Sequence, residues 1–344
     1  MNKKILFVTR KYPPKKGGMQ KYSYDFYTSM KLQSEIDLLK GNLFFISFKY
    51  FLIIFFNKNK YKYIHFGDGV LSFLVLITKF LNSKVQTSIT VHGLDITYSN
   101  KIYQIIIKAS LKKIDKIICV SKYTYLECLN KNISKNKCII INNGIKINKI
   151  QNIENIKKKN KDFIIISVGR QIKRKGINWF IKNVLLKLDK KIKYIIVGEG
   201  PELKKTKEII KYYNLQKQVT IVGEISNYKL NNLFKIADLF IMPNIKLKND
   251  IEGFGIVLLE ASINGVIPIA SNIDGIPDAI INNKNGHLCN EQNTIQFINL
   301  INYYFHNKKE LKKNRKKFRD YTIKNYDWRF LVDKYLTQVF YDGN

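Results

Sequence analysis

Short apolar runs alternate with longer amphipathic stretches along the whole chain. In the first half, runs typical of buried parallel strands occupy residues 5–8, 36–39, 63–65, 85–91, 116–120 and 138–141. The alternation resumes in the second half, with runs at residues 163–168, 194–197, 219–222, 239–242 and 267–270. This pattern predicts two α/β units, each built on a parallel sheet with right-handed crossovers.

A polar stretch rich in Lys and Asn, residues 148–161, separates the two sets of runs. Such a composition is typical of an exposed linker. We therefore expect an N-terminal Rossmann-like domain over 1–147, a linker over 148–161 and a C-terminal Rossmann-like domain over 162–324. A final helix over 325–344, with an apolar stripe from Trp328 to Val339, is expected to cross back toward the N-terminal domain.

Two apolar segments bear on targeting and membranes. The run that follows Lys4 is too short for the core of a signal peptide, so we expect a first strand there. Residues 43–56 form the most apolar stretch, but Lys49 interrupts it and no window reaches the roughly 18 residues of a membrane span. For 43–56 we favour a buried core helix, with a surface that dips into lipid as the alternative.

Charge and cysteine content narrow the class of partner. The net charge is +34, yet only six of the 60 basic residues are Arg and the lysines are scattered. A specific nucleic-acid reader would cluster its charge and use Arg, so we expect no specific nucleic acid and instead an anionic membrane surface, drawn by Lys49, Lys58, Lys60 and Lys62. The four cysteines lack CxxC spacing and are expected to be small buried residues in a reducing compartment.

Two motifs in the first half follow predicted strands, where open α/β sheets present ligand groups. Gly17 and Gly18 open a predicted helix whose backbone N–H groups could meet an anion, although a tight turn explains the pair equally well. His92 ends the strand over 85–91 and could bind a sugar hydroxyl; a structural role is the alternative. For His65 and Asp68, which end another strand, we favour a helix-capping role.

A third motif combines cations with open backbone. Gly169 and Arg170 follow the strand over 163–168, and Lys175 with Gly176 begins the next helix. Two positive side chains at one strand–helix turn suit a diphosphate, whose charge must be neutralised as it leaves. An ordinary solvated basic loop is the alternative.

The segment "EGFGIVLLE" is the most informative. Glu252 ends a loop, Gly253 and Gly255 free the backbone, and Glu260 lies two turns into a predicted helix. If the segment were fully helical, the carboxylates would be roughly 12 Å apart along the axis. Glycosidase pairs are about 5 to 9.5 Å apart, so the spacing instead favours two hydroxyl-bearing ends of one ligand.

Taken in order, Gly17-Gly18, "VHG", "NNGI", "GR" with "KG", "GEGP", "EGFGIVLLE" and "GIPD" resemble the retaining nucleotide-sugar glycosyltransferases of family 4, also called glycosyl transferases group 1. The resemblance covers nearly the whole chain. It implies the GT-B fold, an α/β architecture of two Rossmann-like parallel-sheet domains facing a cleft.

The resemblance also implies roles for single residues. Arg170 and Lys175 match the diphosphate-binding pair of the family, and Glu260 matches its ribose-binding carboxylate. The remaining matches are donor-side groups: Glu252, Gly253, Phe254 and Gly255 at the sugar, Gly169 and Gly18 at the phosphates, and His92 beside the reacting sugar. On this basis His92, Arg170, Lys175 and Glu252 are the expected catalytic residues.

The function implied is retaining, metal-independent transfer of a hexose from a nucleotide diphosphate sugar to a glycan or lipid-linked acceptor. The products would be polysaccharide, lipopolysaccharide or glycolipid. No resident cofactor or metal is expected, and a UDP-sugar is expected ahead of a GDP-sugar. We expect a cytoplasmic enzyme, peripheral on the inner face of the membrane. A nucleotide-sugar epimerase or hydrolase on the same fold, or a non-catalytic basic binding module, are the alternatives.

Overall fold

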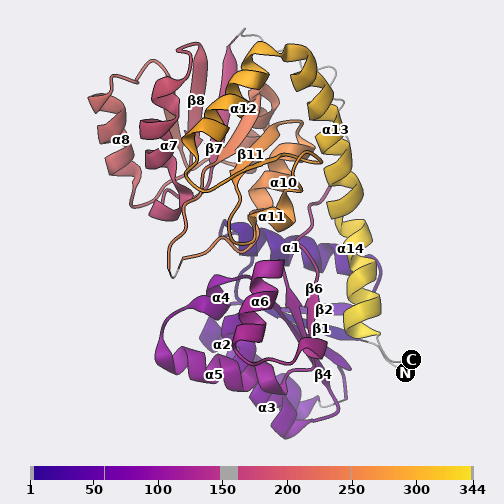
Figure 1. Ribbon diagram of the computed structural model, residues 1–344. Coiled ribbons are helices and arrows are strands. Elements are labelled where there is room, and N and C mark those ends of the chain that lie inside the picture. The colour runs from indigo at the N-terminus through magenta and orange to yellow at the C-terminus, as the bar shows by residue number, and fades with distance from the viewer. Residues whose placement is uncertain (1–3, 58, 148–161, 249, 342–344) are drawn as a thin grey trace. The chain divides into compact units, whose positions relative to one another are not determined.

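The computed structural model describes residues 4–57, 59–147, 162–248 and 250–341, and the chain divides into two compact units (Figure 1). Unit 1 comprises residues 1–146, 249–254 and 326–344, and unit 2 comprises residues 147–248 and 255–325. The expected linker over 148–161 and Lys58 lie outside the described residues. None of the helices in the described ranges is both long enough and apolar enough to cross a membrane.

Unit 1 is built on a parallel six-stranded sheet with the order β2–β1–β3–β4–β5–β6. Its strands are β1 (Ile5–Thr9), β2 (Ile36–Lys40), β3 (Tyr63–Phe66), β4 (Gln86–Val91), β5 (Lys116–Cys119) and β6 (Cys138–Ile140). These confirm the six predicted strands of the first half, because strands covered on both faces leave continuous apolar runs.

The helices of unit 1 cover both faces of this sheet (Figure 1). They are α1 (Gly18–Met30), α2 (Leu43–Phe56), α3 (Phe73–Leu81), α4 (Leu94–Thr97), α5 (Lys101–Lys113), α6 (Lys122–Asn130) and α14 (Trp328–Tyr335), with short turns η1 (Gly69–Ser72), η2 (Lys135–Lys137) and η6 (Leu336–Phe340). One core, which includes Ile46, Leu74 and Ile107, joins α2, α3 and α5 to the sheet.

The C-terminal helix α14 packs against α1 within unit 1. Trp328 is buried with its ring centroid 5.7 Å from that of Tyr22 and 6.1 Å from that of Phe26. The buried Tyr22 hydroxyl hydrogen-bonds the Tyr335 hydroxyl at 3.0 Å and the Thr90 hydroxyl at 2.7 Å. Helix α14 is therefore held to the sheet both by its apolar stripe and by a buried polar chain.

The apolar stretch 43–56 differs from our expectation of a core helix. It forms α2, but only Ile46, Tyr50 and Ile54 are buried. Phe44 is 84% exposed and Phe48 is 60% exposed. The prediction was wrong for most of this helix because a nearly all-apolar sequence has no polar face to indicate which side turns outward.

Unit 2 is built on a second parallel six-stranded sheet with the order β12–β11–β10–β7–β8–β9. Its strands are β7 (Phe163–Val168), β8 (Ile192–Val197), β9 (Val219–Gly223), β10 (Leu239–Met242), β11 (Ile267–Ser271) and β12 (His287–Cys289). Five were predicted and are confirmed. The sequence reading missed β12, which has only three residues and includes a histidine.

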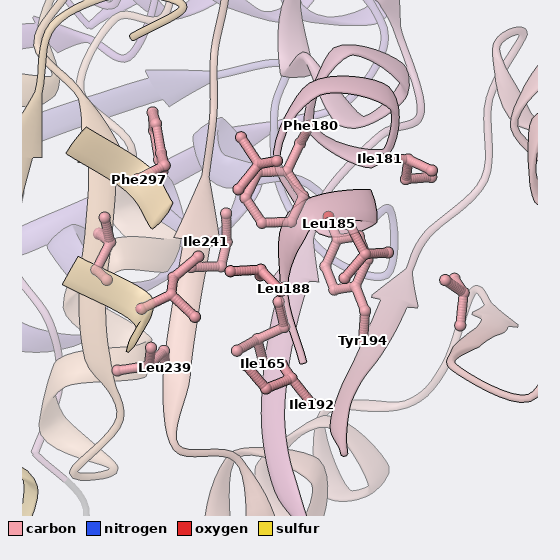
Figure 2. Close-up of a cluster of buried hydrophobic side chains, with 14 of the residues drawn as sticks. Ile165, Phe180, Ile181, Leu185, Leu188, Ile192, Tyr194, Leu239, Ile241 and Phe297 are labelled. Carbon is pink, nitrogen blue, oxygen red and sulfur yellow. The ribbon is translucent and has the colours of Figure 1, made fainter. Parts of the chain in front are cut away.

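The helices of unit 2 enclose an aromatic and aliphatic core (Figure 2). They are α7 (Ile177–Asn183), α8 (Leu203–Tyr212), α9 (Asn227–Ile236), α10 (Ile256–Ile263), α11 (Ile276–Ala279), α12 (Thr294–His306) and α13 (Lys308–Tyr326), with turns η4 (Lys173–Lys175) and η5 (Leu185–Lys187). Phe180 lies at the centre of this core, with its ring centroid 5.3 Å from Tyr194 and 6.1 Å from Phe297.

Candidate functional site

The strand order of the unit 1 sheet reverses between the neighbouring strands β1 and β3, because the chain adds β2 on one side of β1 and β3 on the other. Open α/β sheets bind ligands at such a switch point. Arg10 follows β1 and Asp68 follows β3. The Arg10 Nε donates to Asp68 Oδ1 at 2.9 Å, and the same oxygen accepts the Val70 N–H at 3.0 Å. Burial raises the pKa of Asp68, and the Arg10 guanidinium opposes that rise. This pair ties the two loops of the switch point together.

His92 follows β4 and is held in one tautomer. Its Nε2 lies 3.1 Å from the Gly67 carbonyl oxygen, which can only accept, so Nε2 carries the proton and Nδ1 is left as an acceptor. Burial lowers the pKa of His92 to about 4, so the ring is neutral near pH 7. Asp95 fixes the backbone, because its carboxylate accepts the N–H groups of His92 and Gly69 at 2.8 and 2.9 Å.

The segment 250–254 packs against His92 inside unit 1. A Cβ placed on Gly253 would lie 1.8 Å from the His92 carbonyl oxygen, so only glycine permits this approach. Phe254 is buried with its ring centroid 6.3 Å from that of Tyr326. Two predicted residues from distant parts of the sequence, His92 and Glu252, are therefore brought into one neighbourhood.

Gly17 and Gly18 form the exposed start of α1. Gly17 has φ 145°, and the helix has no side-chain cap and no acidic residue in its first turn. A Cβ on Gly18 would meet nothing within 4 Å. The start of α1 therefore has no side-chain cap, and an anion-binding role for Gly17 and Gly18 stays a prediction. The capping role predicted for His65 and Asp68 is confirmed for Asp68, whose side chain caps η1. It is wrong for His65, which is buried with its ring Nδ1 in a hydrogen bond of 2.8 Å to the Ser88 hydroxyl.

The strand order of the unit 2 sheet reverses between the neighbouring strands β7 and β10. The basic motif lies at this switch point. Gly169 and the exposed Arg170 directly follow β7. Lys175 reaches back over this turn, because a Cβ on Gly169 would lie 3.7 Å from the Lys175 Nζ. The two cations therefore lie at the carboxyl end of one strand, where they can neutralise an anionic ligand.

Glycines allow the backbone to pack tightly around this turn. A Cβ on Gly198, which follows β8, would lie 2.1 Å from the Gly169 carbonyl oxygen. Gly176 has φ 67°, and a Cβ there would lie 1.8 Å from the Pro243 carbonyl oxygen. The loop that follows β10 is thus packed onto the Lys175 turn, and Ile245 donates its N–H to the Arg174 carbonyl at 2.9 Å.

Glu260 lies in the second turn of α10, half-buried among buried neighbours. The helix begins only at Ile256, after Gly255 in the left-handed region with φ 89°. Residues 252–255 are therefore outside the helix, and the helical spacing on which the 12 Å separation depended does not hold. Glu252 belongs to unit 1 and Glu260 to unit 2.

A cavity of about 130 Å³ in unit 2 lies beside this turn and is lined by Gly176, Trp179, Glu202 and Lys205 among others. Its lining includes neither Arg170 nor Glu260. The candidate site is therefore defined by the switch-point residues.

The remaining cluster with metal-ligand chemistry is a group of three buried thiols. The Sγ atoms of Cys119, Cys128 and Cys138 lie within 4.8 Å of one another. The thiol hydrogen bonds to Cys128 and Cys138, together with burial, raise the pKa of Cys119 well above its usual value. The three thiols pack in the apolar core of unit 1, which fits the predicted role of small buried residues.

Sequence reasoning missed Arg10 and Asp95, which position the loops around His92. Arg10 follows β1 directly, and Asp95 comes three residues after His92, so both signals were present in the sequence. Only the folded loops show that the Asp95 carboxylate accepts backbone N–H groups from the loop after β3 and from the loop after β4.

Two parallel-sheet units with ligand-type residues at their switch points define the GT-B fold of glycosyltransferases, and solved structures share it. HepE of Anabaena, solved in complex with UDP, superposes with a TM-score of 0.77 at 15% identity, covering 97% of this chain and 98% of that chain. The fold class is thereby confirmed.

Family models match both parts of the chain. The model described as "Glycosyl transferases group 1" matches residues 148–325, and "Glycosyltransferase Family 4" matches residues 19–149. The chain belongs to the glycosyl transferases group 1, and it is a glycosyltransferase.

Relatives of known sequence agree with this family. An uncharacterized 41.2 kDa protein in the cps region of Klebsiella pneumoniae is 27% identical over 274 residues, which cover 73% of each chain. An uncharacterized glycosyltransferase of Methanocaldococcus jannaschii is 25% identical over 317 residues, covering 90% of this chain and 76% of the relative.

Proposed function

We propose that this glycosyltransferase moves a hexose from a nucleotide diphosphate sugar to a hydroxyl of a glycan or lipid-linked acceptor, with retention and without a metal. The observation that carries the proposal is the turn at the carboxyl end of β7. There Arg170 directly follows Gly169, and the Lys175 side chain reaches back over the open backbone of Gly169, at the switch point of the unit 2 sheet.

In this proposal, unit 2 holds the nucleotide. Arg170 and Lys175 bind the diphosphate, and Gly169 allows it to approach the backbone. Glu260 accepts hydrogen bonds from the ribose hydroxyls, and the uncapped start of α10 at Gly255 faces negative charge. A UDP-sugar is favoured over a GDP-sugar, with support from HepE, which was also solved in complex with UDP-glucose.

Unit 1 supplies groups for the sugar. The neutral His92 ring offers its Nδ1 as an acceptor for a sugar hydroxyl, and its carbonyl is fixed against Gly253. Glu252 and the backbone of Gly253 and Phe254 are the proposed contacts to the hexose. Gly18, at the open start of α1, is the proposed contact to a donor phosphate.

The proposed reaction breaks the bond between the anomeric carbon and the diphosphate oxygen and forms a bond from that carbon to the acceptor oxygen on the same face. The acceptor proton passes to a leaving phosphate oxygen. Arg170 and Lys175 stabilise the negative charge that develops on the diphosphate. The sequence contains no Asp-x-Asp motif for a divalent cation, and these two side chains can take over that neutralising role.

The product class proposed is cell-surface polysaccharide, lipopolysaccharide or glycolipid. The Klebsiella relative, described as a protein in the cps region, supports this class. A lipid-linked acceptor would be met at an anionic membrane surface, where the charge of +34 favours association.

The test is a thermal-shift screen of UDP-, GDP- and ADP-sugars, followed by NMR of the product formed with the stabilising donor. A ligand that binds only the folded state raises Tm, because at a ligand concentration of 100 times Kd it adds about 2.7 kcal/mol to the free energy of unfolding. We expect stabilisation by a UDP-sugar and a product with the donor's anomeric configuration. An inverted product would refute retention, and stabilisation by none of the three would refute donor binding.

A further inference from the structure

Helix α2 carries a stripe of phenylalanines on its outer side. Phe44, Phe48, Phe51 and Phe55 follow one another at intervals of four, three and four residues, which places them on one helical face. Their exposed fractions are 84%, 60%, 44% and 47%. The residues that α2 buries in the core, such as Tyr50, lie on the other side of the helix. This stripe therefore lies outside the buried core of unit 1.

The two helices beside α2 continue the same kind of surface. Helices α2, α3 and α5 share one core on one side of the sheet, so their outer sides are neighbours. Phe80 of α3 is 89% exposed, and Ile102 and Ile105 of α5 are each 70% exposed. We call the following set the outer apolar face: Phe44, Phe48, Phe51, Phe55, Phe56, Leu76, Phe80, Ile102, Ile105 and Ile106.

The three helices of the outer apolar face carry only positive charges, and the nearby Asp115 is ion-paired to Lys79 of α3 at 2.6 Å. Helices α2, α3 and α5 contain no Asp or Glu, whereas α5 contains Lys101, Lys108, Lys112 and Lys113, all exposed. Lys49 of α2 lies over the Phe45 ring, with its Nζ 4.7 Å from the centroid. Exposed aromatic and aliphatic side chains among lysines, on helices without carboxylates, complement a surface that is apolar inside and anionic outside.

This composition separates a lipid surface from a protein partner. The centres of protein–protein interfaces are depleted in Lys, and large exposed apolar patches mark protein or membrane contacts. A basic helix with Phe and Leu on one side lies in the plane of a bilayer interface, with its apolar side at the boundary of headgroups and acyl chains. None of the described helices can span the bilayer, which fits contact with a single leaflet.

We propose that unit 1 docks on an anionic bilayer through the outer apolar face. The phenylalanines of α2 and Phe80 enter the headgroup–acyl boundary, and the lysines of α5 meet the anionic headgroups. The inference rests on the proposed function to the extent that a lipid-linked acceptor would be presented at this surface. It goes further by assigning the contact to particular side chains.

The experiment is co-sedimentation of the full chain with vesicles of equal phosphatidylcholine and phosphatidylglycerol, with pure phosphatidylcholine vesicles for comparison. Wild type should bind the anionic vesicles at low salt and bind more weakly in 1 M salt, where the Debye length falls to about 3 Å. The double variant Phe44→Ser/Phe48→Ser should lower the partition coefficient by about tenfold or more. The matched control Tyr212→Ser/Tyr228→Ser removes two equally exposed rings from unit 2 and should bind like wild type.

A second variant tests the charge part of the proposal. Lys101→Gln/Lys108→Gln/Lys112→Gln should also weaken binding, by about 100-fold if each Lys contributes about 1 kcal/mol, and reduce its salt dependence. Equal binding of both variants and wild type, or equal binding of wild type to both vesicle types, would overturn the proposal. The proposal would also be overturned if wild type were a dimer that binds no vesicles and Phe44→Ser/Phe48→Ser were a monomer. The outer apolar face would then join two copies of the chain.

The same proteins separate this inference from the donor-binding proposal. Every surface variant should keep the thermal stabilisation by a UDP-sugar that wild type shows. Lost vesicle binding with retained stabilisation would support the docking face independently. Normal vesicle binding without stabilisation by any donor would leave docking supported and refute the proposed function.

Discussion

Glu260 provides the sharpest residue-scale test of the nucleotide assignment. It is half-buried in α10 and does not belong to the buried core, so we expect Glu260→Ala to remain folded without ligand, as its Tm measures. Calorimetry should show UDP binding weakened by about tenfold, since hydrogen bonds to ribose would be lost. The control is Glu208→Ala, on an exposed position of α8. Unchanged UDP affinity in the Glu260 variant would refute its role.

Arg170 and Lys175 make a different residue-scale prediction. Because their charges matter most as the diphosphate gains negative charge, Arg170→Ala and Lys175→Ala should each lower kcat by about 100-fold or more and change donor KM less. The double variant should lower kcat by less than the product of the two single effects, since both residues belong to the one turn that follows β7 and are proposed to bind the same diphosphate. Steady-state kinetics with Lys182→Ala as control measures this. Raised KM with unchanged kcat would contradict the assignment.

At the scale of elements, α14 offers a test with a control in the same helix. Trp328 is 1% exposed against Tyr22 and Phe26, whereas Phe330 is 54% exposed. Trp328→Ala should cost about 3–5 kcal/mol in the free energy of unfolding, and Phe330→Ala within about 0.5 kcal/mol. Urea unfolding measures both. Similar effects of the two changes would mean that α14 is not held by its apolar stripe.

The elements also show which parts of the fold were predictable. Eleven strands could be predicted because a strand buried on both faces is a continuous apolar run, whereas β12 is too short to leave one. The outward stripe of α2 could not be predicted, because apolar residues surround the whole helix and only packing shows which side is covered.

The candidate site was predictable to a similar depth. The sequence places His92 after a strand of unit 1 and Arg170 after a strand of unit 2, at the carboxyl ends where parallel sheets present ligand groups. It does not show that Gly253 packs on the His92 carbonyl, or that Lys175 reaches back over Gly169. Those contacts depend on loop conformations with positive φ that no periodic pattern encodes.

At the scale of the whole molecule, buried neutral histidines make stability depend on pH. Burial lowers the pKa of His65 to about 3 and those of His92 and His287 to about 4, from 6.5. In the unfolded chain these histidines therefore bind protons below about pH 6.5, whereas in the folded chain they stay neutral until about pH 4. Their stabilising contribution is complete above 6.5 and is lost as pH falls through that window.

A variant isolates one of these groups. The fall in unfolding free energy between pH 7 and pH 4 should shrink by up to about 3 kcal/mol in His92→Gln, because one pKa unit corresponds to about 1.4 kcal/mol. The exposed His306 serves as control, and His306→Gln should keep the wild-type fall. Chemical denaturation measures the free energy of unfolding at each pH. If it falls equally in wild type, His92→Gln and His306→Gln, His92 is not held neutral by the fold.

The central claim is that the chain transfers a sugar from a nucleotide diphosphate to an acceptor. The most direct measurement follows UDP release from the stabilising UDP-sugar, with and without a lipid-linked glycan extract, and identifies the glycosylated product by mass spectrometry. We predict UDP release that depends on the acceptor, with one hexose added per UDP, and that Arg170→Ala abolishes both. UDP release or donor rearrangement at the same rate without any acceptor would contradict the account and indicate a hydrolase or epimerase instead.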